Sequence, residues 1–201
     1  IAILDNVFAG LPADLEQGSR QQGVWTGRDE LIPILLSDEP QAIAGALLNA
    51  LREGCSMEQL AATVAYAAAL RIAQFHTSNE FGDWDTALHT FTFANAIHQG
   101  LRRAPSPELL RGVFDAAMSV YLDRFLNIPA ARIPHPNGVA KEPTALLNEL
   151  ATLLNQQQQV NEAGQLVAQY LHNGGDPNRL LAALGSALLR EDRDFHTIQS
   201  V

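Results

Sequence analysis

Apolar residues recur along the chain at intervals of three and four positions, and this spacing predicts amphipathic helices almost throughout. Strict alternation of apolar and polar residues at β-branched positions is almost absent, so we expect no β-sheet. The pattern therefore predicts an all-α fold, a multi-helix bundle. The predicted helices span residues 3–9, 12–22, 28–37, 39–53, 57–80, 84–103, 107–126, 144–155, 159–173 and 177–199.

Capping signals support these boundaries. Ser56 opens the sequence Ser-Met-Glu-Gln, a capping box before an apolar run. Ser106 and Asp176 each precede a proline, which favours an N-cap followed by proline at the first helical position. Gly54 and Gly174 stand where a helix must end, because glycine readily adopts the left-handed conformation of a helix C-terminus.

Prolines cluster between Asn127 and Pro143 and interrupt the helical pattern there. We interpret residues 127–143 as a linker. The chain is then a single all-α domain over residues 1–201, built of two halves, 1–126 and 144–201.

The chain also carries an internal similarity. Residues 46–77 align without gaps on residues 166–197, and both segments end in Phe-His-Thr. Each reads as a helix, a glycine turn, a cap and a longer helix with one apolar stripe. We interpret them as a duplicated αα-hairpin with pseudo-two-fold symmetry, in which the two longer helices pack together. Arg71 and Glu191 occupy equivalent positions near the axis, where they either pair or are both solvated.

Net charge limits the classes of partner. The chain carries a net charge of −9 with only 13 Lys and Arg residues, so we expect no nucleic-acid binding, which needs a cationic surface. No apolar run reaches the roughly 18 to 20 residues of a membrane span, and we expect no membrane partner.

The lone Cys55 favours a reducing, cytoplasmic location. We interpret Cys55 as packing filler, although its place before a helix should lower the pKa of its thiol.

Histidines and carboxylates concentrate between His76 and His89. His76 and Glu80 are four residues apart, as are Asp85 and His89, and such pairs share a helix face that can bind iron or zinc. The second copy repeats this spacing with an Asp and a His. The candidate metal ligands are His76, Glu80, Asp85, His89, Asp192 and His196.

Two alternatives to a metal stay open. The histidines could form a structural hydrogen-bonded cluster, or they could act in metal-free proton transfer. Asp83 or Asp85 could simply cap the following helix. If the site is catalytic, the acting residues are His76, His89 and His196. A small organic substrate would then lie against Trp84 and Phe91 and be oriented by Thr92 and Asn95.

The block from Leu70 to Pro134 contains Phe-His-Thr at 75–77, Asp-Trp-Asp-Thr at 83–86 and Leu-Asp-Arg-Phe-Leu at 122–126. It resembles the helical region of bacterial proteins that carry Rieske-type iron–sulfur domains. The pattern His89, Thr92, Ala96 is also similar to questin oxidase-like proteins. This resemblance implies an oxidative role that depends on the three histidines named above. The Rieske ligands, two Cys and two His, have no counterparts here, so we expect no iron–sulfur cluster within this chain.

Two functions follow as expectations. The first is a metal- or histidine-dependent oxidoreductase, or a helical domain associated with one, with iron or zinc as its cofactor if a metal binds. The second is a non-catalytic helical interaction module, in which the histidines are structural and exposed helix faces bind a partner protein or another copy of the chain.

Overall fold

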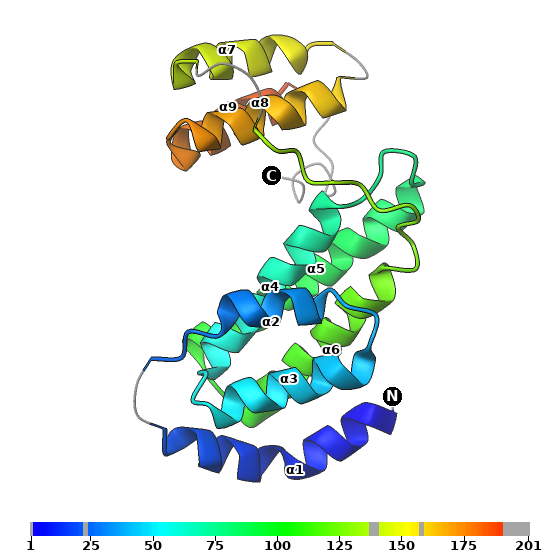
Figure 1. Ribbon diagram of the computed structural model, residues 1–201, viewed down its shortest axis with the longest axis vertical. Helices are drawn as coiled ribbons and strands as arrows, with labels where there is room; N and C mark the ends of the chain where they lie inside the picture. Colours follow the sequence, from blue (N-terminus) through cyan, green and yellow to red (C-terminus); the bar gives the residue numbers. More distant parts are fainter. Residues whose placement is uncertain (1, 22–23, 137–140, 157–158, 191–201) are drawn as a thin grey trace. The chain divides into compact units, whose positions relative to one another are not determined.

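The computed structural model describes residues 2–21, 24–136, 141–156 and 159–190. These ranges contain nine helices and no strand, which confirms the all-α prediction (Figure 1). None of these nine helices is both long and apolar enough to cross a lipid bilayer. The helices are α1 (Ala2–Ser19), α2 (Arg28–Leu35), α3 (Pro40–Arg52), α4 (Met57–Ala73), α5 (Phe81–Arg103), α6 (Pro107–Asp123), α7 (Pro143–Leu153), α8 (Val160–His172) and α9 (Pro177–Leu188).

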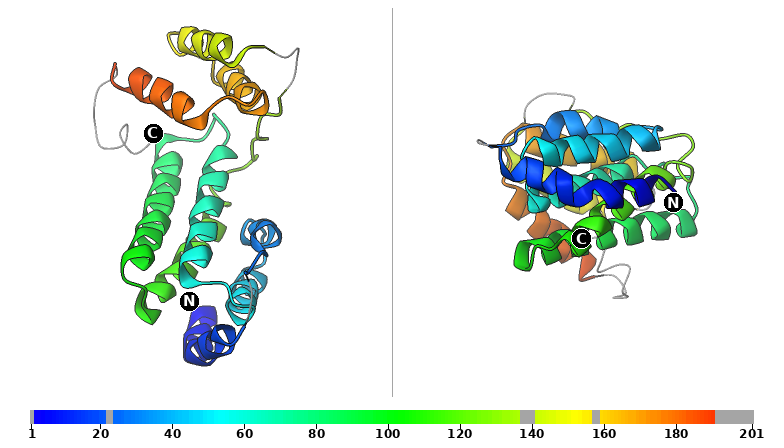
Figure 2. Two further views of the ribbon diagram at one scale, coloured as in Figure 1. Left: turned by 90° about the vertical axis from the view of Figure 1, so that its left-hand side faces the viewer. Right: turned by 90° about the horizontal axis from the view of Figure 1, so that it is seen from below.

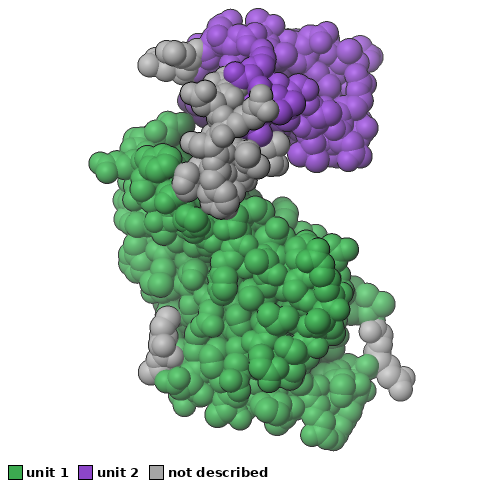
Figure 3. All heavy atoms as spheres, turned by 180° about the vertical axis from the view of Figure 1, so that it is seen from behind, with its two compact units in different colours: residues 1–131 green, residues 132–201 purple. Residues whose placement is uncertain are grey.

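The chain divides into two compact units, residues 1–131 and residues 132–201 (Figure 3). Unit 1 contains α1 to α6, and unit 2 contains α7 to α9. The boundary falls inside the proline-rich segment 127–143. The start of that segment is held to unit 1, because the Ala131 amide and the Asn127 side-chain amide both donate to the carbonyl of Gln74, each at 2.7 Å.

Unit 1 is layered around α4 and α6. α1 packs along α3, and α2 and α3 contact α4 and α6 from the same side (Figures 1 and 2). α5 covers α4 and α6 on the other side and runs alongside α4 after a short connection. α4 is buried on most of its circumference, with Tyr66 exposed on the remaining face, and its many alanines allow neighbouring helices to approach closely. The apolar stripe of the first copy consists of Leu60, Val64, Ala67 and Phe75, and all four are buried.

Unit 2 has a smaller core centred on Tyr170. Its ring is buried with Leu146, Leu150, Leu166 and Leu180. The Tyr170 hydroxyl donates to the carbonyl of Asp176 at 2.9 Å and so satisfies its polar end inside the unit. A Cβ at Gly175 would lie 2.4 Å from the Tyr170 ring, so this position accepts only glycine without rearrangement.

The turns before α4 and α9 are built alike. Gly54 and Gly174 have φ angles of +92° and +77°, the left-handed conformation predicted for them. In each turn the next residue's amide donates to a carbonyl five positions back, at 2.9 Å, which is a Schellman ending. The predicted caps are confirmed as well, because the side chains of Ser56 and Asp176 accept backbone hydrogen bonds at 3.1 and 2.9 Å.

The duplication itself stays a prediction. The two copies lie in different units, and residues 191–197, which end the second copy, lie outside the described residues. A Schellman ending followed by an N-cap is a frequent way to join two helices, so the similar turns do not establish a common origin.

Several helix boundaries differ from prediction. The helix predicted at 177–199 ends at Leu188, and the helices predicted at 84–103 and 107–126 are Phe81–Arg103 and Pro107–Asp123. The segments 3–9 and 12–22 form one helix, α1, with Pro12 inside it. Pro12 removes one helical hydrogen bond, but the face buried at Leu4, Val7 and Leu11 continues past it at Asp14 and Leu15, and packing holds the helix together. The helix predicted at 57–80 ends at Ala73.

Candidate functional site

The predicted histidine patch lies where α4 ends and α5 begins. Because α4 ends before it, His76 does not share a helix face with Glu80, and that part of the prediction is wrong. The Nδ1 atom of His76 instead lies 2.7 Å from the Ser78 hydroxyl and accepts the Ser78 backbone N–H at 3.1 Å. The Nδ1 edge of the imidazole therefore stabilises a local turn and is occupied by hydrogen bonds.

Asp83 organises the start of α5. Its Oδ2 accepts the backbone N–H of Glu80 at 3.2 Å and the side-chain amide of Asn79 at 3.3 Å. Of the two aspartates proposed as caps, Asp83 therefore takes the structural role. Glu80 is exposed at the N-cap of the helix.

Asp85 and His89 form the predicted pair along α5. Oδ1 of Asp85 lies 3.6 Å from Nε2 of His89, and the histidine side chain is 55% exposed. This pair brings two of the predicted ligands together.

The four predicted substrate-binding residues all lie on α5 but use their side chains differently. Trp84 packs on the buried ring of Phe75, with 5.3 Å between ring centroids. Phe91 packs against the core of unit 1. The Thr92 hydroxyl donates to the carbonyl of His89 at 3.0 Å, and the Asn95 carbonyl accepts from Gln99 at 3.4 Å, so both polar groups bond within the helix.

No group of three or more His, Cys, Asp and Glu side chains suited to a metal occurs within residues 2–21, 24–136, 141–156 and 159–190. Two predicted ligands, Asp192 and His196, lie outside those ranges. The metal site and the catalytic roles of His76, His89 and His196 therefore stay predictions, as do the substrate-binding roles.

The structure also contains a buried charged cluster that the sequence did not predict. Arg71 of α4 and Asp123 of α6 are only 7% and 4% exposed. Nη2 of Arg71 donates to the carbonyl of Leu36 at 3.0 Å, and Asp123 is hydrogen-bonded to Thr90 of α5. Arg71 is therefore not solvated, and that alternative for it is wrong. Glu191, its proposed partner, lies outside the described residues.

Burial dominates the electrostatics of this cluster. It raises the pKa of Asp123 to about 6, although the Thr90 hydrogen bond and the Arg71 charge both act to lower it. Burial also lowers the pKa of Arg71, against the attraction of Asp123. The desolvation of both charges thus exceeds their mutual attraction, as is common for buried ion pairs. The cluster ties α2, α4, α5 and α6 together in the interior.

The pKa of the Cys55 thiol differs from expectation, whereas its packing role does not. Its side chain belongs to the core of unit 1, in agreement with a packing role. Burial raises the pKa of its thiol to about 12, so the predicted lowering by the helix N-terminus is wrong.

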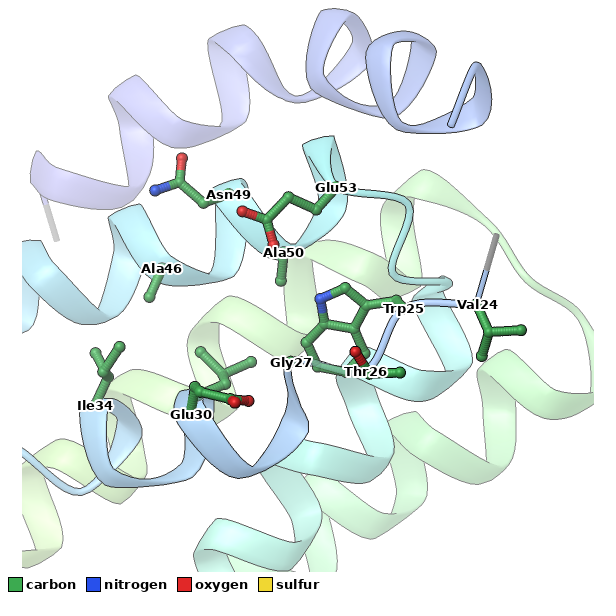
Figure 4. Close-up of a pocket in the computed structure, with 11 residues that line it drawn as sticks. Val24, Trp25, Thr26, Gly27, Glu30, Ile34, Ala46, Asn49, Ala50 and Glu53 are labelled. Carbon is green, nitrogen blue, oxygen red and sulfur yellow. The ribbon is translucent and has the colours of Figure 1, made fainter. Parts of the chain in front are cut away.

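Unit 1 contains a hollow of about 510 Å³ between α2 and α3 (Figure 4). The apolar part of its lining is formed by Leu31 and Ile34 of α2, by Ala46 and Ala50 of α3, and by the ring of Trp25. A Cβ at residue 27 would lie 3.0 Å from Nε1 of Trp25, so the glycine there leaves room for the indole. Sequence reasoning missed this hollow because its two helices are brought together only by the core.

The charged groups of this hollow are acidic, and its other polar side chains, Thr26 and Asn49, are neutral. Glu30 of α2 and Glu53, the residue after α3, line it together with Trp25, and no Lys, Arg or His among the described residues lines it (Figure 4). Neither carboxylate forms an ion pair with a described residue. The nearest arginines in sequence are used elsewhere, since Arg28 lies over the Tyr66 ring at 4.5 Å and Arg52 pairs with Asp14 at 2.7 Å. The hollow therefore combines an aromatic face with two uncompensated negative charges.

Comparison with known proteins gives no relative from which a role could be transferred: no protein-family model, no curated protein and no solved structure matches this chain.

Proposed function

We infer that unit 1 is a binding module for a small organic cation, an ammonium compound with an apolar body. The observation that carries this proposal is that Trp25, Glu30 and Glu53 line the same hollow of about 510 Å³. Ligand pockets typically measure about 300 to 1,000 Å³ and combine apolar walls with a few oriented polar groups.

The chemistry of the lining favours a cation over a neutral or anionic ligand. A tryptophan face attracts cations more strongly than the other aromatic side chains do, and a carboxylate adds a direct charge interaction. An anion would face Glu30 and Glu53 without a compensating positive group among the lining residues. Ile34 and Ala46 then provide the surface against which the apolar body of the ligand packs.

A fluorescence titration tests this proposal. A Trp84→Phe background leaves Trp25 as the only tryptophan, because the chain has two. We expect phenylethylammonium to change its emission saturably, and phenylpropionate, of similar size but opposite charge, to leave it unchanged. Glu30→Gln and Glu53→Gln should each weaken binding about two- to fivefold, the effect of losing one exposed ion pair.

Asp29→Asn is the matched control, since Asp29 lies beside Glu30 on α2, is exposed and does not line the hollow. Equal binding of phenylpropionate, or equal weakening by Asp29→Asn and Glu30→Gln, would show that the hollow does not select cations, and the proposal would fail.

The oxidoreductase expected from the sequence is a second proposal, favoured by the Asp85–His89 pair at 3.6 Å. Carboxylate and imidazole at this spacing suit iron or zinc. Elemental analysis of the purified chain and of the variants His89→Ala and His196→Ala tests it. Stoichiometric metal that both variants lose would support a metal site. Metal-free protein with unchanged folding would count against a metal-dependent enzyme.

A further inference from the structure

Unit 2 contains an apolar groove between α7 and α9, with a volume of about 550 Å³. The residues that line it repeat at helical spacing on both elements. On α7 and the residue after it they include Leu147, Ala151 and Leu154; on α9 they include Ala183 and Ala187. Side chains three, four and seven positions apart lie on one helix face, so the groove runs along both helices for about three turns.

The floor of the groove on the α9 side is made of small side chains. Ala182, Ala183, Ser186 and Ala187 face it, and α8 packs on α7 rather than along α9. Interaxial distances between packed helices of about 8 to 10 Å depend on the side chains at the contact, and small ones allow the closest approach. The shape therefore suits a third helix laid along α7 and α9.

The charges of the groove indicate what that helix carries. Arg179 and Arg190 line the groove at its two ends, and no Asp or Glu of the described residues lines it, in a chain with a net charge of −9. Within the described residues, the hydrogen-bond acceptors of these arginines are neutral: the Thr144 hydroxyl at 3.5 Å and the Asn155 side-chain carbonyl at 2.8 Å. These partners orient the guanidinium groups without neutralising them.

The spacing of the arginines favours a peptide over a small acid. They are eleven positions apart, which corresponds to about 16 Å along a helix axis. A single carboxylate group reaches one of them only, whereas a helix of about three turns spans both. Docking of an amphipathic helix into an apolar groove is a recurring mode of peptide recognition.

We propose that the α7–α9 groove of unit 2 docks an amphipathic helix of a partner protein, with apolar residues on one face and an acidic residue near each end. This role is independent of cation binding by unit 1. Apolar side chains of the partner contact the alanine floor, and its two carboxylates pair with Arg179 and Arg190.

A charge-reversal experiment on the full chain tests the proposal. The probe is a fluorescein-labelled peptide of about four helical turns, held helical by a hydrocarbon staple on its outer face. It carries leucines at i, i+3, i+4 and i+7 and a glutamate near each end, and a second peptide carries lysines in place of the glutamates. Binding is measured by fluorescence anisotropy, and folding of every variant is checked by circular dichroism.

We expect the acidic peptide to bind the natural chain and the double variant Arg179→Glu/Arg190→Glu to bind it about tenfold more weakly. The same variant should bind the lysine peptide more tightly than the natural chain does. Ser186→Gln, which places a polar side chain in the groove at an exposed position, should weaken both peptides. Arg132→Glu is the matched control, because Arg132 is an exposed arginine of unit 2 that does not line the groove.

Three results would overturn the proposal. The first is acidic-peptide binding that neither the double variant nor Ser186→Gln changes. The second is tight binding of dodecanoate in the absence of peptide binding, which would make the groove a site for a small aliphatic acid. The third is a dimer in sedimentation velocity that dissociates in the double variant, which would identify a second copy of this chain as the occupant.

Discussion

The buried carboxylate of Asp123 makes the stability of unit 1 depend on pH, and Asp123→Asn isolates this effect. The folded pKa of about 6 lies about two units above the value near 4 expected for an unfolded chain. The folded state therefore holds the proton more tightly than the unfolded state does. Its contribution to stability is complete below pH 4 and is lost as the pH rises through 6.

The magnitude follows from the size of the shift. One unit of pKa corresponds to about 1.4 kcal/mol, so two units lower the free energy of unfolding by about 3 kcal/mol between pH 4 and pH 7. Asparagine is neutral throughout this range, so the unfolding free energy of the variant does not fall for this reason. The difference in unfolding free energy, variant minus natural chain, should therefore rise by about 3 kcal/mol from pH 4 to pH 7.

Urea denaturation at a series of pH values measures this difference. Tryptophan fluorescence reports on unit 1 alone, because Trp25 and Trp84 are the two tryptophans of the chain and both belong to it. Comparison at equal pH cancels the titration of all other carboxylates. Asp115→Asn, at an exposed position on the same helix, is the matched control and should give no such rise.

Arg71→Met provides a second check of the same reasoning. Removal of the positive charge deprives Asp123 of an attraction that lowers its pKa, so the pH at which stability falls should move upward. A difference curve for Asp123→Asn that is flat between pH 4 and pH 7, or that falls, would refute the assignment of Asp123 as a carboxylate whose charged form is penalised by burial.

Two further predictions concern close packing and burial in unit 1. Gly18→Ala should destabilise unit 1 by about 1 to 3 kcal/mol in urea denaturation, since its Cβ would lie within 1.9 Å of the backbone oxygen of Leu51. Gly10→Ala on the same helix meets no atom closer than 3.6 Å and should stabilise it by about 0.5 to 1 kcal/mol; a loss in both variants equally would contradict the steric explanation. Cys55 should react with a thiol-specific disulfide reagent at pH 8 only after unfolding, because burial raises its pKa to about 12. Fast reaction of the folded chain would contradict this.

The helices and their caps could be predicted from sequence because both depend on near neighbours. The caps at Ser56 and Asp176 and the left-handed glycines at 54 and 174 are confirmed, since each involves residues within one turn of the chain. The Asp85–His89 pair is confirmed for the same reason, because a four-residue spacing on a continuous helix fixes the distance between the two side chains.

The end of α4 could not be predicted in this way. The carbonyl of Gln74 accepts hydrogen bonds from Asn127 and Ala131, more than fifty residues later in the chain. With that carbonyl bonded outside the helix, the chain turns, Phe75 is buried and His76 bonds to Ser78. A contact from a distant segment thus decided the geometry of the histidine patch.

The sequence by itself determined the all-α class, most helix positions and the caps, because helical periodicity and capping are local properties of the chain. Only the tertiary structure decided which helices meet, and with them the buried Arg71–Asp123 cluster, the hollow beside Trp25 and the groove beside Arg179. Each of these features combines side chains from separate helices, whose juxtaposition results from packing the whole core rather than from spacing along the chain.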